Sequence, residues 1–502
     1  MAGGSMICGA IKTVLADIAG LSVFSDLRTH PLINALEDLL GSVVYDGVID
    51  GGAADNAGPL TENWGLLGLC RRWAAFTGNF VRFAEQKSFY GAIAALTLEA
   101  DNAFTRAAEK NGAGTAVMDA ALDAVTDGGP PPALQAAAAA DLNRLGRIAA
   151  FDTAGLGAWI AGILRSRGLE AAAEGVETEA RAFPVQAASA AADLFPENAP
   201  WAEALPAFGG RLRRNGAGML GLRRSFRWAE PAKAADGLWP VPNPDPVRLD
   251  QLSGYNDQRG LVVNNTLRFL AGKPANNLLL YGDRGTGKSA TVKAAANAFA
   301  GQGLRLLEVR KADLPQLSLI METLGNRALR FIIFIDDLSF EETGDSFISL
   351  KALLEGGIET KPPNTVLYAT SNRRHLVKEY FADRPSPAGA ASGDVRAFDT
   401  MQEQFSLADR FGLTVVFAAP DQEEYLRIAE YIAGQRGLLA ADGTEEARRF
   451  FRENALRWER WFNGRSPRTA VQYVDWIAGL PLPWDGSGFP WDEIRRATGP
   501  GL

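Results

Sequence analysis

Apolar positions follow different patterns before and after about residue 230. In the first part the sequence is rich in Ala and Leu, and apolar residues recur at the spacing of a helix face, as at Leu32, Leu36 and Leu39. Breakers such as the DGGPPP stretch at Asp127–Pro132 separate the helical stretches. We therefore expect an all-helical N-terminal domain over residues 1–229. Its sequence carries no repeat and no cluster of polar residues with recognisable chemical spacing, so its role is not indicated.

A proline-rich stretch follows this helical part. Glu230–Asp250 reads EPAKAADGLWPVPNPDPVRLD. Each proline removes a backbone donor and fixes φ, so neither a helix nor an inner strand persists through the stretch. We predict a linker over residues 230–248 and a domain boundary there.

Beyond the linker, short apolar runs of strand length alternate with helical stretches. This alternation is typical of a parallel sheet in an α/β domain. We predict a five-stranded parallel sheet within an α/β domain over residues 249–420. The five runs are NLLLYG at Asn277–Gly282, LRLLEV at Leu304–Val309, FIIFID at Phe331–Asp336, TVLYAT at Thr365–Thr370 and LTVVFA at Leu413–Ala418.

The pattern becomes helical again from Asp421. Asp421 and Glu424 form a capping box, and Gly437 ends the first helix. One apolar face of that helix consists of Tyr425, Ile428, Ala429 and Ile432. We predict a helical lid over residues 421–482, followed by a C-terminal tail over residues 483–502.

Composition narrows the classes of protein that fit this pattern. Lys plus Arg number 51 and Asp plus Glu number 59, which gives a net charge of −8. Such a balance does not favour nucleic acid or anionic lipid as a partner of the whole chain, so any such contact must be local. Two cysteines and two histidines exclude a disulfide scaffold and leave too few ligands for a zinc site.

The apolar stretches are too short for a membrane protein. The longest suggestive run, Thr153–Leu164, falls well below the roughly 20 residues of a membrane span. The N-terminal residues MAGGSMICGAIK lack the basic region of a secretion signal. We therefore expect no membrane span and a cytoplasmic location.

The clearest chemical motif is GDRGTGKS, which follows an apolar strand and opens a helix, as a phosphate-binding loop requires. Glycines let successive N–H groups turn inward toward phosphate oxygens, and the helix N-terminus adds its positive dipole end. Lys288 would place its charge on the β- and γ-phosphates, and Ser289 would be a ligand to Mg²⁺. The predicted phosphate-binding residues are Gly282, Asp283, Arg284, Gly285, Thr286, Gly287, Lys288, Ser289 and Ala290.

Polar residues end two further predicted strands. FIIFIDD delivers Asp336 and Asp337 to the edge of the sheet where ligands of open α/β sheets bind. We interpret Asp336 as the Mg²⁺ carboxylate, acting through water, and Asp337 as the general base that orients the attacking water. Asn372 ends the TVLYATSN run, where its amide would reach the γ-phosphate and that water. A loop Asp that caps the next helix and a turn Asn of local origin remain the alternatives.

Two arginines are candidates for completing the site. Arg410, in SLADRFG, stands ahead of the last strand and would reach a nucleotide bound to a neighbouring subunit. Arg468, in GRSPRTAVQYV, projects from a predicted helix start and would sense the γ-phosphate from the lid. Arg465 competes with Arg468 for that role, and a surface ion pair is the alternative for Arg410.

Together these motifs resemble the AAA+ ATPases, and within them the bacterial group called domain of unknown function 815. The resemblance spans about residues 245–482 and rests on FIIFIDDLSFEE, LLEGGIE, YATSNRRHL, SLADRFGL and GRSPRTAVQYVDW. It implies ATP and Mg²⁺ bound between sheet and lid, and a homo-oligomeric ring, with a hexamer among the options. It also implies an adenine pocket, for which Leu252, Gly254 and Tyr255 are candidates. Asp337 stands where the commonest AAA+ pattern has Glu, although bacterial replication initiators and helicase loaders carry the same Asp pair.

We therefore predict a cytoplasmic ATPase that couples hydrolysis of MgATP to a conformational change on a protein or nucleic-acid client. Two other functions stay open. One is a nucleotide-gated binding module or scaffold with little turnover, which Asp337 motivates. The other is a small-molecule P-loop kinase, which would need no Arg410 from a neighbour.

One further segment stands out for its charge. Arg211–Trp228 carries six arginines and no acid, interleaved with aromatic residues. We first interpret this segment as a surface that is solvated or faces another domain, with its arginines paired to acidic residues elsewhere in the chain. Nucleic acid, lipid headgroups or an acidic partner are the alternative ligands, although no base-reading motif accompanies the segment.

Overall fold

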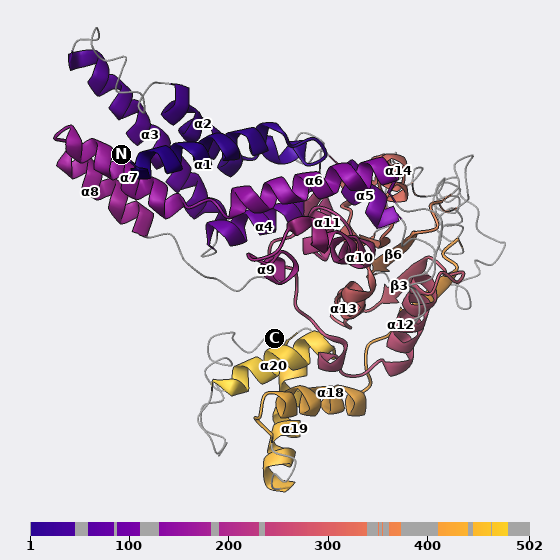
Figure 1. Ribbon diagram of the computed structural model, residues 1–502. Helices are drawn as coiled ribbons and strands as arrows, with labels where there is room; N and C mark the ends of the chain where they lie inside the picture. The colour runs from indigo at the N-terminus through magenta and orange to yellow at the C-terminus, as the bar shows by residue number, and fades with distance from the viewer. Residues whose placement is uncertain are drawn as a thin grey trace, which may run out of the picture. The chain divides into compact units, whose positions relative to one another are not determined.

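The computed structural model describes residues 2–45, 59–84, 88–110, 130–181, 190–229, 236–338, 350, 354, 361–372, 410–439, 445–462 and 464–479. The chain divides into two compact units (Figure 1). The first comprises Met1–Gly114 and Asp119–Leu222, and the second comprises Thr115–Met118 and Arg223–Leu502. Each unit is described by itself.

The described part of the first unit is helical, as predicted, but the predicted range of 1–229 is wrong at its end, because residues 225–228 form a strand that belongs to the second unit. Its core contains large aromatic side chains, among them Trp73, Phe76, Phe104 and Trp201. Its α-helices are α1 (Ala2–Ala19), α2 (Pro31–Tyr45), α3 (Pro59–Ala84), α4 (Phe89–Glu99), α5 (Ala103–Lys110), α6 (Pro132–Ala149), α7 (Thr153–Ser166), α8 (Glu170–Arg181), α9 (Ala190–Leu194), α10 (Leu205–Asn215) and α11 (Met219–Leu222). Short 3-10 helices are η1 (Ser25–Thr29) and η3 (Trp201–Ala204).

A fully buried carboxylate organises one turn of this unit. Asp141 of α6 accepts backbone N–H bonds from Ser22, Val23 and Phe24 at 2.7–3.1 Å, and its other oxygen pairs with Arg144 at 2.7 Å. A buried charge needs such partners, because its desolvation would otherwise be costly. Asp141 is therefore structural. In the described chain no single helix is long and apolar enough to cross a membrane, and only the bent pair α6 and α7, at 48°, reaches that length together.

The second unit combines a sheet with helices. Its strands are β1 (Ser225–Trp228), β2 (Leu238–Pro240), β3 (Leu278–Gly282), β4 (Leu304–Glu308), β5 (Arg330–Ile335), β6 (Thr365–Ser371) and β7 (Leu413–Phe417). Its helices are η4 (Leu249–Gln251), α12 (Asn256–Leu270), α13 (Lys288–Phe299), η5 (Ala300–Gln302), η6 (Lys311–Gln316), α14 (Leu317–Gly325), α18 (Gln422–Gln435), α19 (Glu445–Trp461) and α20 (Pro467–Ala478).

The sheet has seven strands in the order β2-β1-β4-β5-β6-β3-β7. The five predicted strands are its neighbouring members β4, β5, β6, β3 and β7, and all of them pair in parallel. The prediction of a five-stranded sheet is wrong, because β1 adds in parallel to β4 and β2 adds antiparallel to β1. These strands have four and three residues, too short to show alternation, and Pro240 is tolerated because β2 is an edge strand.

The proline-rich segment is held against the second unit at residues 245–247. The side-chain amide of Asn297 in α13 donates to the backbone carbonyls of Asp245 and Val247, at 2.8 and 2.9 Å. Prolines cannot donate to a ladder, but their carbonyls and those of their neighbours still accept hydrogen bonds. The segment therefore lies along α13, which begins at the phosphate loop.

Three helices close the described chain, as predicted for the lid. Asp421 caps α18, accepting the N–H of Glu424 at 2.8 Å. The buried residues of these helices form one apolar cluster with those that cover the sheet, including Tyr425, Phe451 and Tyr473. The helices therefore share a core with the α/β part of the second unit.

Candidate functional site

The loop after β3 has a backbone that only glycine permits at its start. Gly282 has φ of 135°, and a Cβ there would lie 2.1 Å from the carbonyl oxygen of Phe417. Gly287, with φ of 90°, is the N-cap of α13. The first N–H groups of any helix lack helical acceptors, so those of α13 are available to an anion at this loop.

The loop is anchored to the end of the neighbouring strand β7. The N–H of Asp283 donates to Phe417 at 2.9 Å, and its carboxylate accepts the N–H of Ala419 at 2.7 Å. The Thr286 hydroxyl donates to the carbonyl of Asp283 at 2.8 Å. These bonds fix the curvature of the loop before any ligand binds.

Lys288 is buried and turns back over its own loop. Its ammonium donates to the carbonyls of Gly282 and Asp283 at 3.0 and 2.7 Å. Burial lowers the pKa of Lys288 to about 8, although Asp283, Asp336 and Asp337 act in the opposite direction. A buried ammonium that lacks a directly bound carboxylate favours an incoming anion.

Asp336 follows β5 and receives two hydroxyl groups on one oxygen. Ser289 Oγ and Thr370 Oγ1 both donate to Asp336 Oδ1, each at 2.6 Å. Ser289 comes from the phosphate loop and Thr370 from β6, which lies between β3 and β5 in the sheet. Because of this strand order, the loop after β3, the end of β5 and the end of β6 meet at the Asp336 carboxylate.

Asp337 has a strained backbone conformation and is held by Thr370 of β6 and by Asn372, which follows β6. Its φ is 53°, in the left-handed region that costs a non-glycine residue about 1–3 kcal/mol. Its N–H donates to Thr370 Oγ1 at 2.9 Å, and its carboxylate accepts from Asn372 Nδ2 at 2.6 Å. Its side chain is exposed, in contrast to the buried strand before it. The site thus presents Asp337 and Asn372 as a hydrogen-bonded pair facing solvent.

These donors fit Mg²⁺ in the manner of a nucleotide site. The described residues contain no cluster of three or more His, Cys, Asp or Glu side chains that would hold a metal alone. Mg²⁺ at phosphates uses one or two protein oxygens together with waters and phosphate oxygens. Ser289 and Asp336 supply two oxygens beside the phosphate loop, so they would hold the ion only when a phosphate is present.

The helical part meets the loop through its backbone. The N–H of Arg468, at the start of α20, donates to the carbonyl of Gly285 at 3.1 Å. A Cβ at Gly285 would lie 2.9 Å from Ser466 Oγ and 3.0 Å from Arg468 Cβ. The Arg468 side chain is exposed, whereas Arg465 pairs with the buried Glu459 at 2.6 Å. Arg465 therefore has a partner within the helices, and Arg468 lies against the loop.

Arg410 is not brought to this site. It precedes β7 at the amino end of that strand, whereas the phosphate loop leaves the carboxyl end of the paired strand β3. The register pairs Leu278 with Leu413 and Gly282 with Phe417, so Arg410 lies more than about 13 Å from its own loop. It would act only on another subunit. The preceding residues of SLADRFG, 406–409, fall outside the described residues.

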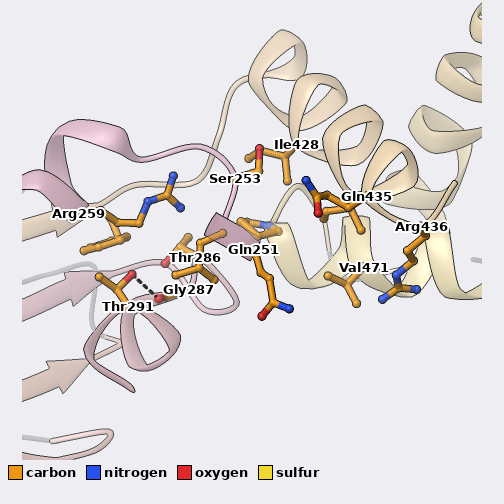
Figure 2. Close-up of a pocket in the computed structure, with 14 residues that line it drawn as sticks. Gln251, Ser253, Arg259, Thr286, Gly287, Thr291, Ile428, Gln435, Arg436 and Val471 are labelled. Atoms are coloured by element: carbon orange, nitrogen blue, oxygen red, sulfur yellow. Dashed lines mark hydrogen bonds between the residues drawn. The ribbon is translucent and has the colours of Figure 1, made fainter. Parts of the chain in front are cut away.

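A cavity of about 320 Å³ lies beside the loop (Figure 2). In Figure 2 Thr286 and Gly287 of the loop lie on one side of it, and Gln435 at the end of α18 and Arg436 just after it lie on the other. Its wall is formed by Gln251, Leu252, Ser253, Arg259, Thr286, Gly287, Thr291, Phe417, Ile428, Ile432, Gln435, Arg436, Pro467 and Val471. Both apolar and amide side chains line the cavity, a combination suited to a nucleobase.

Two candidates for this pocket lie elsewhere than expected. Leu252 lines it, but Gly254 and Tyr255 do not belong to its described wall. Tyr255 is buried behind Phe417, with ring centroids 5.2 Å apart, and its hydroxyl donates to Ala418 at 2.6 Å. Burial raises the pKa of the Tyr255 phenol, which keeps it a donor. Its φ of 56° is rare for a bulky residue, so tertiary contacts hold it there.

Thr370 was missed by the sequence reasoning. A β-branched residue is expected in any strand, so nothing in TVLYATSN distinguishes this threonine from Thr365. The only available signal was its position two residues before Asn372. The polar lining of the pocket by Gln251, Gln435 and Arg436 was also missed, because these residues are far apart in the sequence.

The chain has a distant similarity to several solved structures. The Holliday junction branch migration motor RuvB of Thermotoga maritima is 15% identical, with a TM-score of 0.26, over 47% of this chain and 75% of RuvB. A variant of that RuvB has a TM-score of 0.30 at 15% identity over 46% of this chain, which spans only 64% of the RuvB chain. AMPPCP-bound DnaA from Aquifex aeolicus is 15% identical, with a TM-score of 0.34, over 51% of this chain and 70% of DnaA.

A family model matches the second half of the chain. No curated protein matches the sequence significantly. The model that matches is described as a protein of unknown function, DUF815, and it matches residues 222–480, from just before β1 to just after α20. Because this match spans more than half of the 502 residues, the chain belongs to the DUF815 family.

Proposed function

We propose that this protein is an AAA+-type ATPase that binds MgATP at the loop after β3 and hydrolyses its terminal phosphate. The strand order is the observation that carries the proposal. Because β6 lies between β3 and β5, the phosphate loop, two carboxylates and an amide meet at the carboxyl edge of one sheet. Ligands of open α/β sheets bind at this edge.

The loop residues bind and orient the triphosphate. Backbone N–H groups around Gly285, Thr286 and Gly287 and at the start of α13 would face the β- and γ-phosphate oxygens. Lys288 would exchange its two carbonyl acceptors for phosphate oxygens. Ser289 and Asp336 would hold Mg²⁺, which neutralises the charge that develops on the transferred phosphoryl group.

Asp337 and Asn372 would position the attacking water. The carboxylate accepts a proton from that water, and the amide fixes its direction. The single hydroxyl of Thr370 holds the Asp336 carboxylate and the backbone N–H of Asp337 in place. Arg410 of a neighbouring subunit would approach the γ-phosphate, which requires a homo-oligomer such as a ring.

The helices α18 and α20 would transmit the state of the nucleotide. They carry part of the pocket wall, and Arg468 contacts the loop carbonyl of Gly285. A γ-phosphate would draw the Arg468 guanidinium inward, and its loss would release it. The resulting movement of the helices against the sheet would act on a protein or nucleic-acid client.

A nucleotide-gated scaffold with little turnover is the second candidate. The 2.6 Å bond between Asn372 and Asp337 favours it, because this bond occupies the carboxylate that a water would need. In that case ATP would order an assembly without being consumed. Asp337 would then serve only to hold Asn372.

Steady-state phosphate release separates these functions. Wild-type protein, concentrated enough to self-associate, should release phosphate from MgATP, and Lys288→Ala should not. Lys293→Ala in the same helix is the matched control, because Lys293 pairs only weakly with Asp245 at 3.8 Å. Tight ATP binding without release in any oligomeric state would favour the scaffold, and release by Lys288→Ala at the wild-type rate would reject the proposed site.

A further inference from the structure

An exposed arginine and tryptophan pair lies at the free edge of the sheet, remote in the strand order from β3. β1 and β2 pair antiparallel, and Arg227 stands directly opposite Trp239. Residues opposite each other in such a pair point to the same face, with Cβ atoms about 5 Å apart. The two side chains therefore leave adjacent strands on the same surface.

That surface is the solvent face of the two strands. Phe226, Trp228 and Leu238, which alternate with the pair, are 1%, 3% and 5% exposed. Arg227 is exposed, and Trp239 is 48% exposed. An exposed indole on an edge strand offers a flat apolar face to a ligand.

Unpaired positive charge adjoins the pair. Arg223 and Arg224 immediately precede β1, and both are exposed. Neither has a side-chain hydrogen bond or an ion pair within the described parts of the chain. Arg227 pairs with Glu308 of β4 at 2.9 Å, but both side chains are exposed, so this pair contributes little and is readily exchanged. Three arginines thus lie within five residues at β1, one of them directly opposite the indole, and they concentrate positive charge locally on a chain of net charge −8.

We propose that Arg223, Arg224, Arg227 and Trp239 bind single-stranded nucleic acid. Guanidinium groups bind phosphates of the backbone, and an exposed aromatic ring stacks on an unpaired base. In a duplex the bases are already stacked, so the indole would have no partner there. An anionic membrane would require several apolar side chains on this face, and the other aromatic residues of the two strands are buried. An acidic peptide would use the arginines but leave the indole open.

The test measures binding of fluorescein-labelled dT20 and rU20 to the full-length protein by anisotropy at several salt concentrations. Wild type should bind with an affinity that falls as salt rises. Trp239→Ala should bind about five- to 150-fold more weakly, and Trp239→Phe should retain most of the affinity. The double variant Arg223→Gln/Arg224→Gln should bind more weakly and show a salt slope smaller by about one to two.

Charge-matched and site-matched controls make the result decisive. The double variant Arg268→Gln/Arg460→Gln removes two exposed arginines, one from α12 and one from α19, and should bind the oligonucleotides like wild type. Lys288→Ala, which removes the candidate ATP site, should also bind them like wild type. Equal thermal midpoints exclude misfolding of the variants. The proposal is overturned by absence of binding at 50 mM salt, by an equal affinity of the Trp239→Ala variant, by equal binding of a 20-base-pair duplex, or by binding only to phosphatidylserine vesicles.

Discussion

Replacing Thr370 by Val removes one hydroxyl and leaves the shape of the side chain nearly unchanged. In the structure this hydroxyl donates to the Asp336 carboxylate and accepts the N–H of Asp337. A hydrogen bond to a charged group contributes about 1.5–3 kcal/mol, and a buried N–H left without an acceptor costs about 1–3 kcal/mol. Thr370 is 2% exposed, so water cannot easily replace the lost group.

The expected effect is on turnover and not on ATP affinity. If about 1.4–2.8 kcal/mol of this loss falls on the transition state, kcat decreases about tenfold to a hundredfold. KM for ATP should stay within about twofold, because the phosphate loop is untouched, and the Mg²⁺ concentration needed for half-maximal rate should rise. Thr370→Ser should restore most of the rate, because it restores the hydroxyl.

The matched control is Thr365→Val in the same strand. Thr365 is 1% exposed, and its hydroxyl donates to the carbonyl of Pro362 at 3.0 Å. This variant should lose comparable stability but keep kcat, since its hydroxyl lies at the opposite end of β6. Equal kcat losses in both variants, or an unchanged kcat in Thr370→Val, would refute the positioning of the carboxylates by Thr370.

Three further predictions follow from the second unit. Burial lowers the pKa of Lys361 to about 8 from its usual 10.5. Between these two pH values the unfolded chain binds more protons than the folded chain. The free energy of unfolding should therefore rise as the pH increases from 8 to 10. The rise attributed to Lys361 is at most about 3 kcal/mol, and in urea titrations the difference between wild type and Lys361→Met should show it. Arg468→Ala should lower the rate of ATP hydrolysis on the order of 10²-fold with little change in stability. Arg465→Ala should instead lower mainly the urea midpoint of unfolding. The opposite pattern would show that Arg465, and not Arg468, acts on the nucleotide. Arg410→Ala should lose about 10³-fold in hydrolysis, and mixing it with inactive Lys288→Ala subunits should restore activity only if Arg410 acts between subunits.

The sequence predicted those parts of the fold whose signals are local. GDRGTGKS needs glycine at Gly282 for a close backbone approach and at Gly287 for a helix N-cap, and both requirements are met within a few residues of chain. Four of the longer strands, β3, β4, β5 and β6, were predictable because they are buried on both faces and read as continuous apolar runs, whereas β7 at the sheet edge buries only alternate residues. The capping of α18 by Asp421 is local in the same way.

Features that depend on tertiary pairing were not predictable. β1 and β2 are short, carry an arginine and a proline, and become strands only because β4 offers a free edge. Nothing in the sequence around Thr370 indicates that its hydroxyl bonds to Asp336 and Asp337. Tyr255 was expected in the pocket, but its contact with Phe417 and Ala418, about 160 residues later in the chain, buries it behind the wall.

Calorimetric titration with the slowly hydrolysed analogue ATPγS tests the central claim most directly. The wild-type protein and Lys293→Ala should bind about one analogue per subunit, more tightly with Mg²⁺ than with EDTA, and Lys288→Ala should bind at least about a hundredfold more weakly. Equal binding by all three proteins, or no binding by the wild type, would contradict a triphosphate site at the loop after β3.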